Sequence, residues 1–183
     1  MLKIVISALA ILALWGCAGP RDFPPIGNAT PEAYRLDSGD QLRVIVYDAD
    51  RLTGDYVVDD EGTISIPLIG HVQARGQTTA ELEKSIKDRL AGTVLVAPSV
   101  AVQVQFYRPY FVLGEVNQPG QYPSIGYMTV SSAVAAAGGF TYRADTDTVT
   151  ITRRNGDQVV KGSAHGDTEI LPGDVIYVYD SIF

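Results

Sequence analysis

Apolar and polar residues alternate along several stretches of the chain, and this alternation predicts β-strands. Thr63-Ile64-Ser65-Ile66 alternates with a period of two, and valine occupies every second position from Val100 to Val104. Such a period is typical of strands with one buried face. Further strands are expected where β-branched and aromatic residues gather, at residues 42–47, 56–58, 71–74, 110–116, 121–123, 148–152, 159–160 and 175–178.

Two segments have the pattern of helices instead. Thr78 and Glu81 form a capping box at the start of the first segment, and Gly92 is expected to end it. The second helix is expected over residues 129–137, closed by Gly138-Gly139 in a left-handed cap. The residues predicted to face the core are Leu82, Ile86, Leu90, Val130, Val134 and Ala137. Strands mixed with one main helix in each half predict an α+β fold of two small domains.

Composition shifts divide the chain into four segments. Residues 1–16 have the form of a secretory signal, and residues 17–30 are rich in proline and glycine, which predicts a flexible tether. Two domains are expected to follow, over residues 31–107 and 108–183, with Arg108-Pro109 at the boundary.

Leu14-Trp15-Gly16-Cys17 has the form of a bacterial lipobox. The apolar stretch before it is shorter than the roughly 20 residues that span a bilayer. Cleavage between Gly16 and Cys17 would leave a cysteine that carries several acyl chains, enough for stable anchoring. The alternative is an ordinary secreted protein that loses Cys17 with its signal. Because Ala18 stands where an aspartate would favour the inner membrane, we expect a lipid anchor on the periplasmic face of the outer membrane.

Charge and ligand content exclude several classes of function. The chain has 14 Lys and Arg against 21 Asp and Glu, a net charge of -7, which is unfavourable for nucleic-acid binding. Cys17 is the only cysteine, so disulfides within the chain and thiolate metal sites are excluded. His71 and His165 are the only histidines and stand far apart in the sequence, so we expect no metal and no cofactor.

A Gly-Asp step precedes a strand twice, at Gly39-Asp40 and at Gly173-Asp174. Each step is typical of a tight turn whose carboxylate accepts hydrogen bonds from nearby backbone amides. The alternative is that Asp40 and Asp174 form a catalytic carboxylate pair. We favour the turns, because they explain both steps without further assumptions.

The motifs resemble those of outer-membrane polysaccharide export lipoproteins. The segments similar to their export-sequence domain are residues 34–44, 58–70, 76–82 and 98–100. The segments similar to the soluble-ligand-binding β-grasp (SLBB) domain that follows it are residues 111–123, 136–140 and 150–154. The resemblance covers nearly the whole chain after Cys17, in the expected order, and it implies an α/β export-sequence domain followed by one β-grasp domain.

This resemblance implies a homo-oligomeric ring that conducts capsular polysaccharide or exopolysaccharide through the periplasm without making or breaking bonds. Its implied partners are the polymer and an inner-membrane polysaccharide co-polymerase, often joined to a tyrosine kinase. Large family members add further β-grasp repeats and a C-terminal pore helix, whereas this chain ends at Phe183 directly after a strand. It therefore resembles the short members, and a separate outer-membrane pore protein is an expected partner.

Two other function classes remain open. An enzyme that trims polysaccharide would use two carboxylates, drawn from Asp59, Asp60, Glu61 and Glu115, but the sequence has no recognised catalytic constellation, so we nominate no catalytic residue. A lipoprotein that only binds glycan or scaffolds other envelope proteins would use exposed aromatic rings. The candidate glycan or subunit contacts are Tyr107, Tyr110, Tyr122, Tyr127 and Tyr142, for which core packing is the stronger alternative.

Overall fold

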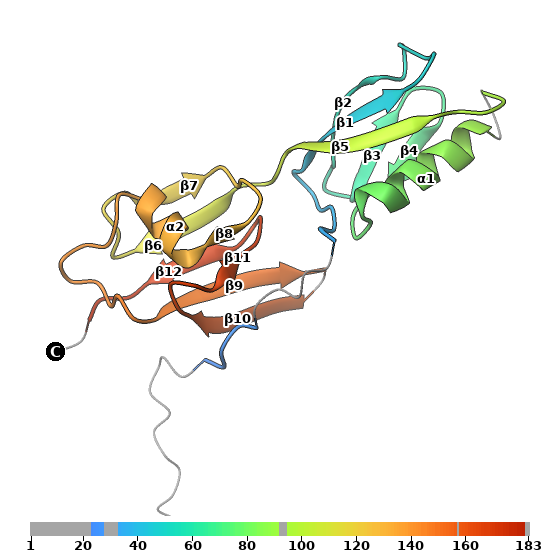
Figure 1. Cartoon of the computed structure of the whole chain (residues 1–183). Coiled ribbons are helices and arrows are strands. Elements are labelled where there is room, and N and C mark those ends of the chain that lie inside the picture. The colour runs from blue at the N-terminus through green and yellow to red at the C-terminus, as the bar shows by residue number, and fades with distance from the viewer. Residues whose placement is uncertain (1–22, 28–32, 92–94, 157, 182–183) are drawn as a thin grey trace, which may run out of the picture.

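The computed structural model describes residues 23–27, 33–91, 95–156 and 158–181. The predicted signal segment, with Gly16, and the predicted lipidation site Cys17 lie outside the described residues. Figure 1 shows two bodies joined where β5 passes into β6. Each body has its own cluster of buried apolar residues, so the expected α+β fold of two small domains is confirmed.

The first domain packs one helix and a small hairpin against a three-stranded sheet. The sheet has the order β2-β1-β5, with antiparallel neighbours throughout. Its strands are β1 (Gln41–Val46), β2 (Gly54–Val57) and β5 (Val100–Phe106). The hairpin consists of β3 (Thr63–Ile66) and β4 (Gly70–Gln73), and the helix is α1 (Thr79–Ala91).

Alternating burial explains why these segments form strands on one core. Every second residue of β1 is buried, and Ile64 and Ile66 of β3 are buried in the same way. The capping box that begins α1 is formed in both directions: the Thr78 amide donates to Glu81, and the Glu81 amide donates to the Thr78 hydroxyl. Leu82, Ile86 and Leu90 are fully buried, as predicted. Since Gly92 lies outside the described residues, its role as a stop stays a prediction.

The second domain is a five-stranded sheet covered on one face by a short helix. The sheet order is β10-β9-β12-β6-β7, and the central pair β12 and β6 is parallel while the other neighbours are antiparallel. The strands are β6 (Tyr110–Gly114), β7 (Gly120–Tyr122), β9 (Val149–Asn155), β10 (Gln158–Ala164) and β12 (Val175–Val178). A small ladder pairs β8 (Met128–Thr129) with β11 (Glu169–Ile170), and the helix is α2 (Val130–Ala136).

The start of α2 is capped by Thr129, which forms a capping box with Ser132. Val130, Val134 and Ala137 are buried, as the periodicity predicts. Gly138 and Gly139 follow in left-handed conformations, with φ of 79° and 86°. No helix in the described part of the chain is long and apolar enough to cross a membrane.

The structure corrects the sequence predictions in two places. The strand expected at residues 159–160 is a seven-residue strand, β10, and the ladder of β8 and β11 was not predicted. Part of the predicted flexible tether is also ordered. Residues 23–27 lie against β10, where Pro25 and Ser163 form an isolated parallel β-bridge.

Candidate functional site

The two Gly-Asp steps form turns of the same geometry. Asp40 is fully buried, and its Oδ2 accepts the Asp37 amide at 2.9 Å. Asp174 is 1% exposed, and its Oδ2 accepts the Leu171 amide at 2.8 Å. In both turns the glycine before the aspartate is left-handed, with φ near 90°. Glycine adopts that region without strain. The predicted tight turns, in which the aspartate carboxylate accepts a backbone amide, are therefore confirmed at both places.

Asp174 is bound by an arginine of its own domain. Arg153 Nε lies 3.0 Å from Asp174 Oδ1, and Arg153 Nη2 lies 2.7 Å from Oδ2. The same Nη2 donates to the Glu169 carbonyl at 3.0 Å. This two-point pairing of guanidinium and carboxylate is the strong form of such an ion pair. The Asp174 turn is therefore a closed structural unit of the second domain.

Asp40 is bound instead by the linker between the domains. The Arg108 backbone amide donates to Asp40 Oδ1 at 2.9 Å, and the Arg108 guanidinium lies 3.6 Å from Oδ2. The Tyr34 hydroxyl donates to the same carboxylate at 2.8 Å. Burial, followed by the negative charge of Asp40, raises the pKa of Tyr34 well above its usual range. Tyr34 therefore keeps its proton at neutral pH and acts as a hydrogen-bond donor to Asp40.

Arg108 contacts the Gly-Asp turns of both domains. A Cβ added at Gly39 would lie 3.6 Å from Arg108 Cβ, and one added at Gly173 would lie 2.5 Å from Arg108 Nε. The Gly173 amide also donates to the carbonyl of Pro109, next to Arg108, at 3.2 Å. The boundary residue predicted from the sequence therefore joins the two domains through side-chain chemistry as well as through the backbone.

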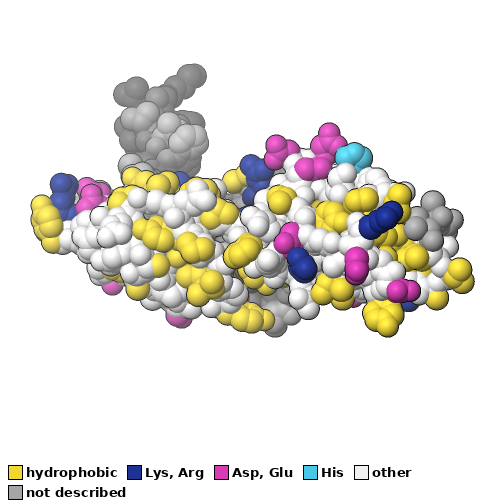
Figure 2. Space-filling view, turned by 90° about the horizontal axis from the view of Figure 1, so that it is seen from above, with side chains coloured by type: hydrophobic (Ala, Val, Ile, Leu, Met, Phe, Trp, Pro, Cys, Tyr) yellow, Lys and Arg dark blue, Asp and Glu magenta, His cyan; other side chains and the backbone are white. Residues whose placement is uncertain are grey.

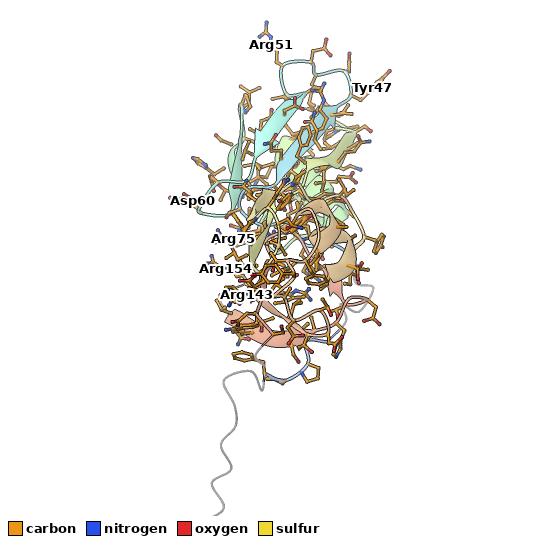
Figure 3. The ribbon with its side chains drawn as sticks, turned by 90° about the vertical axis from the view of Figure 1, so that its left-hand side faces the viewer. Tyr47, Arg51, Asp60, Arg75, Arg143 and Arg154 are labelled. Carbon is orange, nitrogen blue, oxygen red and sulfur yellow. The ribbon has the colours of Figure 1, made fainter. Side chains whose placement is uncertain are left out.

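Asp37 extends this arrangement into what we call the junction cluster: Tyr34, Asp37, Asp40, Arg75 and Arg108. Asp37 lies 3.0 Å from Arg75 Nε and 3.6 Å from Arg108 Nη2. Arg75 also donates to the backbone carbonyl of Asp60 at 2.7 Å. In Figure 3, Arg75 and Asp60 of the first domain and Arg143 and Arg154 of the second lie along one edge of the molecule.

The charged side chains of the junction cluster form ion pairs and hydrogen bonds with one another. Asp40 has four donors around it and no open side, because the residue is fully buried. Asp40 is held by Arg108 of the linker, whereas Asp174 is held by Arg153 of the second domain. These contacts support a structural role for both aspartates rather than the alternative of a catalytic pair.

The five candidate tyrosines divide into packed and projecting residues. Tyr110 is 1% exposed and stacks on Tyr122, with ring centroids 5.8 Å apart. Tyr107 is half-buried and meets Tyr34 edge to face at 4.9 Å. Tyr127 and Tyr142 are 92% and 95% exposed. As a glycan or subunit contact, Tyr110 is excluded in this conformation because it belongs to the core, whereas Tyr127 and Tyr142 present full ring surfaces to solvent.

Two of the four carboxylates considered for catalysis, Asp59 and Glu115, are engaged in local structure, while Asp60 and Glu61 are exposed. The Thr63 amide and hydroxyl donate to the two oxygens of Asp59, each at 2.7 Å, and these bonds lower the pKa of Asp59. A general acid needs a raised pKa instead. Glu115 accepts the Thr141 hydroxyl at 2.6 Å. Among the described residues, no three His, Cys, Asp or Glu side chains are grouped for metal binding.

Sequence reasoning missed an open hollow of about 320 Å³ in the second domain. Phe23, from the segment before the first domain, forms one wall of it. The other lining residues are Asp145, Thr148, Thr150, Ser163, His165 and Tyr179. No local motif could have revealed this hollow, because its walls come from residues more than 100 positions apart.

Charge is distributed unevenly over the two domains. On the face shown in Figure 2, acidic and basic side chains gather over the first domain, at the right, while most of the second domain is uncharged with scattered apolar side chains. Elsewhere on the same domain, the loop between β7 and β8 exposes two apolar side chains, Ile125 at 70% and Tyr127 at 92%. Interface cores are depleted of charge, so this face of the second domain has the composition of a contact surface.

Comparisons with known proteins agree with this two-domain organisation. The family model "Polysaccharide biosynthesis/export protein" matches residues 28–105, and the model "SLBB domain" matches residues 109–162. The exopolysaccharide production protein ExoF of Rhizobium meliloti (strain 1021) is 35% identical in an alignment of 146 residues, and the match covers 73% of this chain. The match spans only 33% of that relative's length. This chain belongs to the polysaccharide biosynthesis/export family, and within it an SLBB domain follows the export domain.

Proposed function

We propose that this protein is a lipid-anchored subunit of a ring-shaped periplasmic conduit that exports capsular polysaccharide or exopolysaccharide. The observation that carries the proposal is the match of both domains, in order, to an export family, behind a lipobox cysteine. The lipid on Cys17 would hold the chain on the periplasmic face of the outer membrane. The family is described as a polysaccharide biosynthesis/export protein, and within it we propose a role in export without a catalytic step.

The junction cluster supports the ring. A closed ring of identical chains needs a fixed shape in each chain, because a small angular error repeats at every interface. Arg108 connects Asp37 and Asp40 in the first domain and lies against Gly173 in the second. This contact favours one angle between the domains, so that both could form stacked layers of the same ring.

The uncharged face of the second domain supports the same proposal. Identical chains of net charge -7 repel one another, so contacts between them are best made where charge is sparse. Tyr127 and Ile125 project from that domain and are suited to such a contact. The polymer, an inner-membrane co-polymerase with its tyrosine kinase, and a separate outer-membrane pore protein are the partners we propose.

Deletion of the gene, followed by tracking of the polymer, tests the export function. We expect polymer to accumulate inside the cell envelope and to disappear from the medium or cell surface, with recovery when the wild-type gene is restored. Restoration with Cys17→Ser should return the protein but little export, because the anchor is lost. Normal amounts of external polymer in the deletion strain would contradict the proposal.

A second candidate is a lipoprotein that binds glycan or acts as a scaffold without conducting it. The exposed rings of Tyr127 and Tyr142 favour this alternative, because aromatic rings stack on sugar faces. This alternative predicts a different result in the deletion strain. Polymer would still leave the cell after deletion, and only its retention at the surface would change. Trimming of the polymer is the least supported function, and unchanged polymer length in the deletion strain would argue against it.

A further inference from the structure

Residues 23–27 are attached to the second domain, although the chain continues from them into the first. The Ile26 amide donates to the Ser163 carbonyl at 2.8 Å, and the Ser163 amide donates to the Pro24 carbonyl at 3.0 Å. The Ser163 hydroxyl donates to the Phe23 carbonyl at 3.0 Å. Three hydrogen bonds therefore link a segment of five residues to one position of β10. We call residues 23–27 the strap.

Side chains strengthen this attachment. Ile26 packs against the core of the second domain. Lys161 Nζ lies 4.3 Å from the centroid of the Phe23 ring, within the range of a cation–π contact. Gly162 allows the close approach, since an added Cβ would lie 2.8 Å from Ile26 Cβ and 2.9 Å from the Pro24 carbonyl oxygen. All three contacts depend on the strap being docked.

The strap also fills a structural need of the second domain. β10 is the last strand of the five-stranded sheet, with a neighbour on one side only. An open strand edge leaves backbone amides and carbonyls unpaired and invites pairing with other chains. The strap pairs with this edge at Ser163. It is thus a docked part of the second domain.

From this geometry we infer that the strap places the β10 edge of the second domain next to the lipid surface. The inference rests on the proposed acylation of Cys17. Phe23 follows Cys17 by only six residues, and an extended chain spans at most ~3.6 Å per residue, or ~22 Å in all. With the strap docked, Phe23 cannot lie farther than that from the lipid anchor. If the strap were free, the chain from Cys17 to the first domain would leave both domains far more freedom.

The same geometry places the first domain farther from the lipid. In Figure 1, α1 and β10 lie on opposite sides of the molecule. Beyond the docked strap, the surface that faces the β10 side of the second domain is therefore the phospholipid leaflet that holds the anchor, and α1 faces the periplasm. The strap makes the anchor an orienting element as well as an attachment.

Energy transfer from a single label to headgroup-labelled lipid tests this inference in the acylated protein. Since acylation consumes the Cys17 thiol, a cysteine introduced at Val159 on β10 or at Lys87 on α1 would be the one reactive thiol in each protein. Val159 is 63% exposed and Lys87 is exposed, so both accept a label without disturbing a core. In phosphatidylethanolamine–phosphatidylglycerol vesicles we expect at least twofold more transfer from position 159. Equal transfer, or more from position 87, overturns the inference.

Release of the strap supplies the control. Gly162→Val should expel Ile26 and Pro24 from β10, and Ile26→Asp should do the same without changing the sheet. Each should reduce the difference between the two labels by at least half while the protein still floats with the vesicles. An unchanged difference in both variants would show that the strap does not orient the molecule. A wild-type protein that fails to float contradicts the proposed anchor itself, which is a separate result from equal transfer by a floating protein.

Discussion

The two Gly-Asp turns share one local geometry and differ in what binds their carboxylates. Asp174 is paired at two points with Arg153, a neighbour on the same sheet, at distances down to 2.7 Å. Asp40 is paired with Arg108 of the linker, whose guanidinium lies 3.6 Å away and whose amide lies at 2.9 Å. The same turn therefore stabilises one domain internally and connects the other domain to its neighbour. The Gly-Asp motif specifies the turn, and the position of the arginine that binds the aspartate determines whether the turn stabilises one domain or connects two.

The largest expected loss of stability follows from breaking the Asp174–Arg153 ion pair inside the second domain. Asp174→Ala leaves Arg153, which is 13% exposed, without its counter-charge. Removing one partner of a buried ion pair costs about 3–5 kcal/mol of folding free energy. We expect hydrogen exchange to show loss of protection throughout the second domain while the first keeps its protection. Loss of protection in both domains would contradict the view that this turn is a closed unit.

Removing the linker arginine should have a smaller effect and a different location. Arg108→Leu keeps the backbone amide and the Tyr34 hydroxyl on Asp40, so we expect a cost of about 1–3 kcal/mol. The main result should be a wider range of angles between domains that each stay folded, measured by small-angle X-ray scattering. Arg43→Leu is the matched control, because its pair with Asp55 is exposed and is worth about 0–1 kcal/mol. Unchanged scattering for Arg108→Leu would contradict the claim that Arg108 restricts the angle between the two domains.

The two turn glycines separate backbone strain from contact with Arg108. Alanine in the left-handed region costs about 1–2 kcal/mol at Gly39 and at Gly173 alike. Only at Gly173 would the new Cβ also meet the Arg108 side chain, at 2.5 Å from Nε. We therefore expect similar losses of stability in urea titrations but altered scattering for Gly173→Ala alone. Equal scattering changes in both variants would mean that strain, and not Arg108, sets the angle.

The smallest effect at neutral pH should come from Tyr34, which donates to Asp40 and accepts from Arg108 in the junction cluster. Burial and the Asp40 charge raise its pKa in the folded protein above the usual value of 10.0. A group of this kind stays protonated in the folded chain while it ionises in the unfolded chain, so stability falls as pH rises above about 10. We expect Tyr34→Phe to flatten this decline for the first domain in unfolding experiments between pH 8 and about 11. An unchanged slope would place the responsible group elsewhere.

Local patterns in the sequence predicted most of the framework, since strands and helix caps depend on nearby residues. The alternation in β3, the capping box of α1 and both Gly-Asp turns are properties of short segments, whereas the capping box of α2 was not predicted. The ladder of β8 and β11 was missed because two-residue strands have no period to detect. The extended β10 was missed because Lys161, Gly162 and Ser163 interrupt its apolar run.

The candidate site was less accessible to sequence reasoning. Arg108 was identified as a boundary but not as the partner of Asp40, which is 68 positions away. The strap was expected to be part of a free tether, yet Phe23 contacts Ser163, which is 140 positions away. Such pairings depend on how the domains pack, and no local pattern encodes them. Exposure likewise separated Tyr127 and Tyr142 from Tyr110, which shares their residue type but lies in the core.

Electron microscopy of the acylated protein, extracted in mild detergent, tests the central claim most directly. The conduit proposal predicts closed rings with an open centre and two stacked layers, one from each domain of every chain. Arg108→Leu should disturb the stacking of these layers before it disturbs the folding of either domain. Particles of single-chain size at all protein concentrations, in a preparation that retains the lipid on Cys17, would contradict the proposal that this chain forms a conduit.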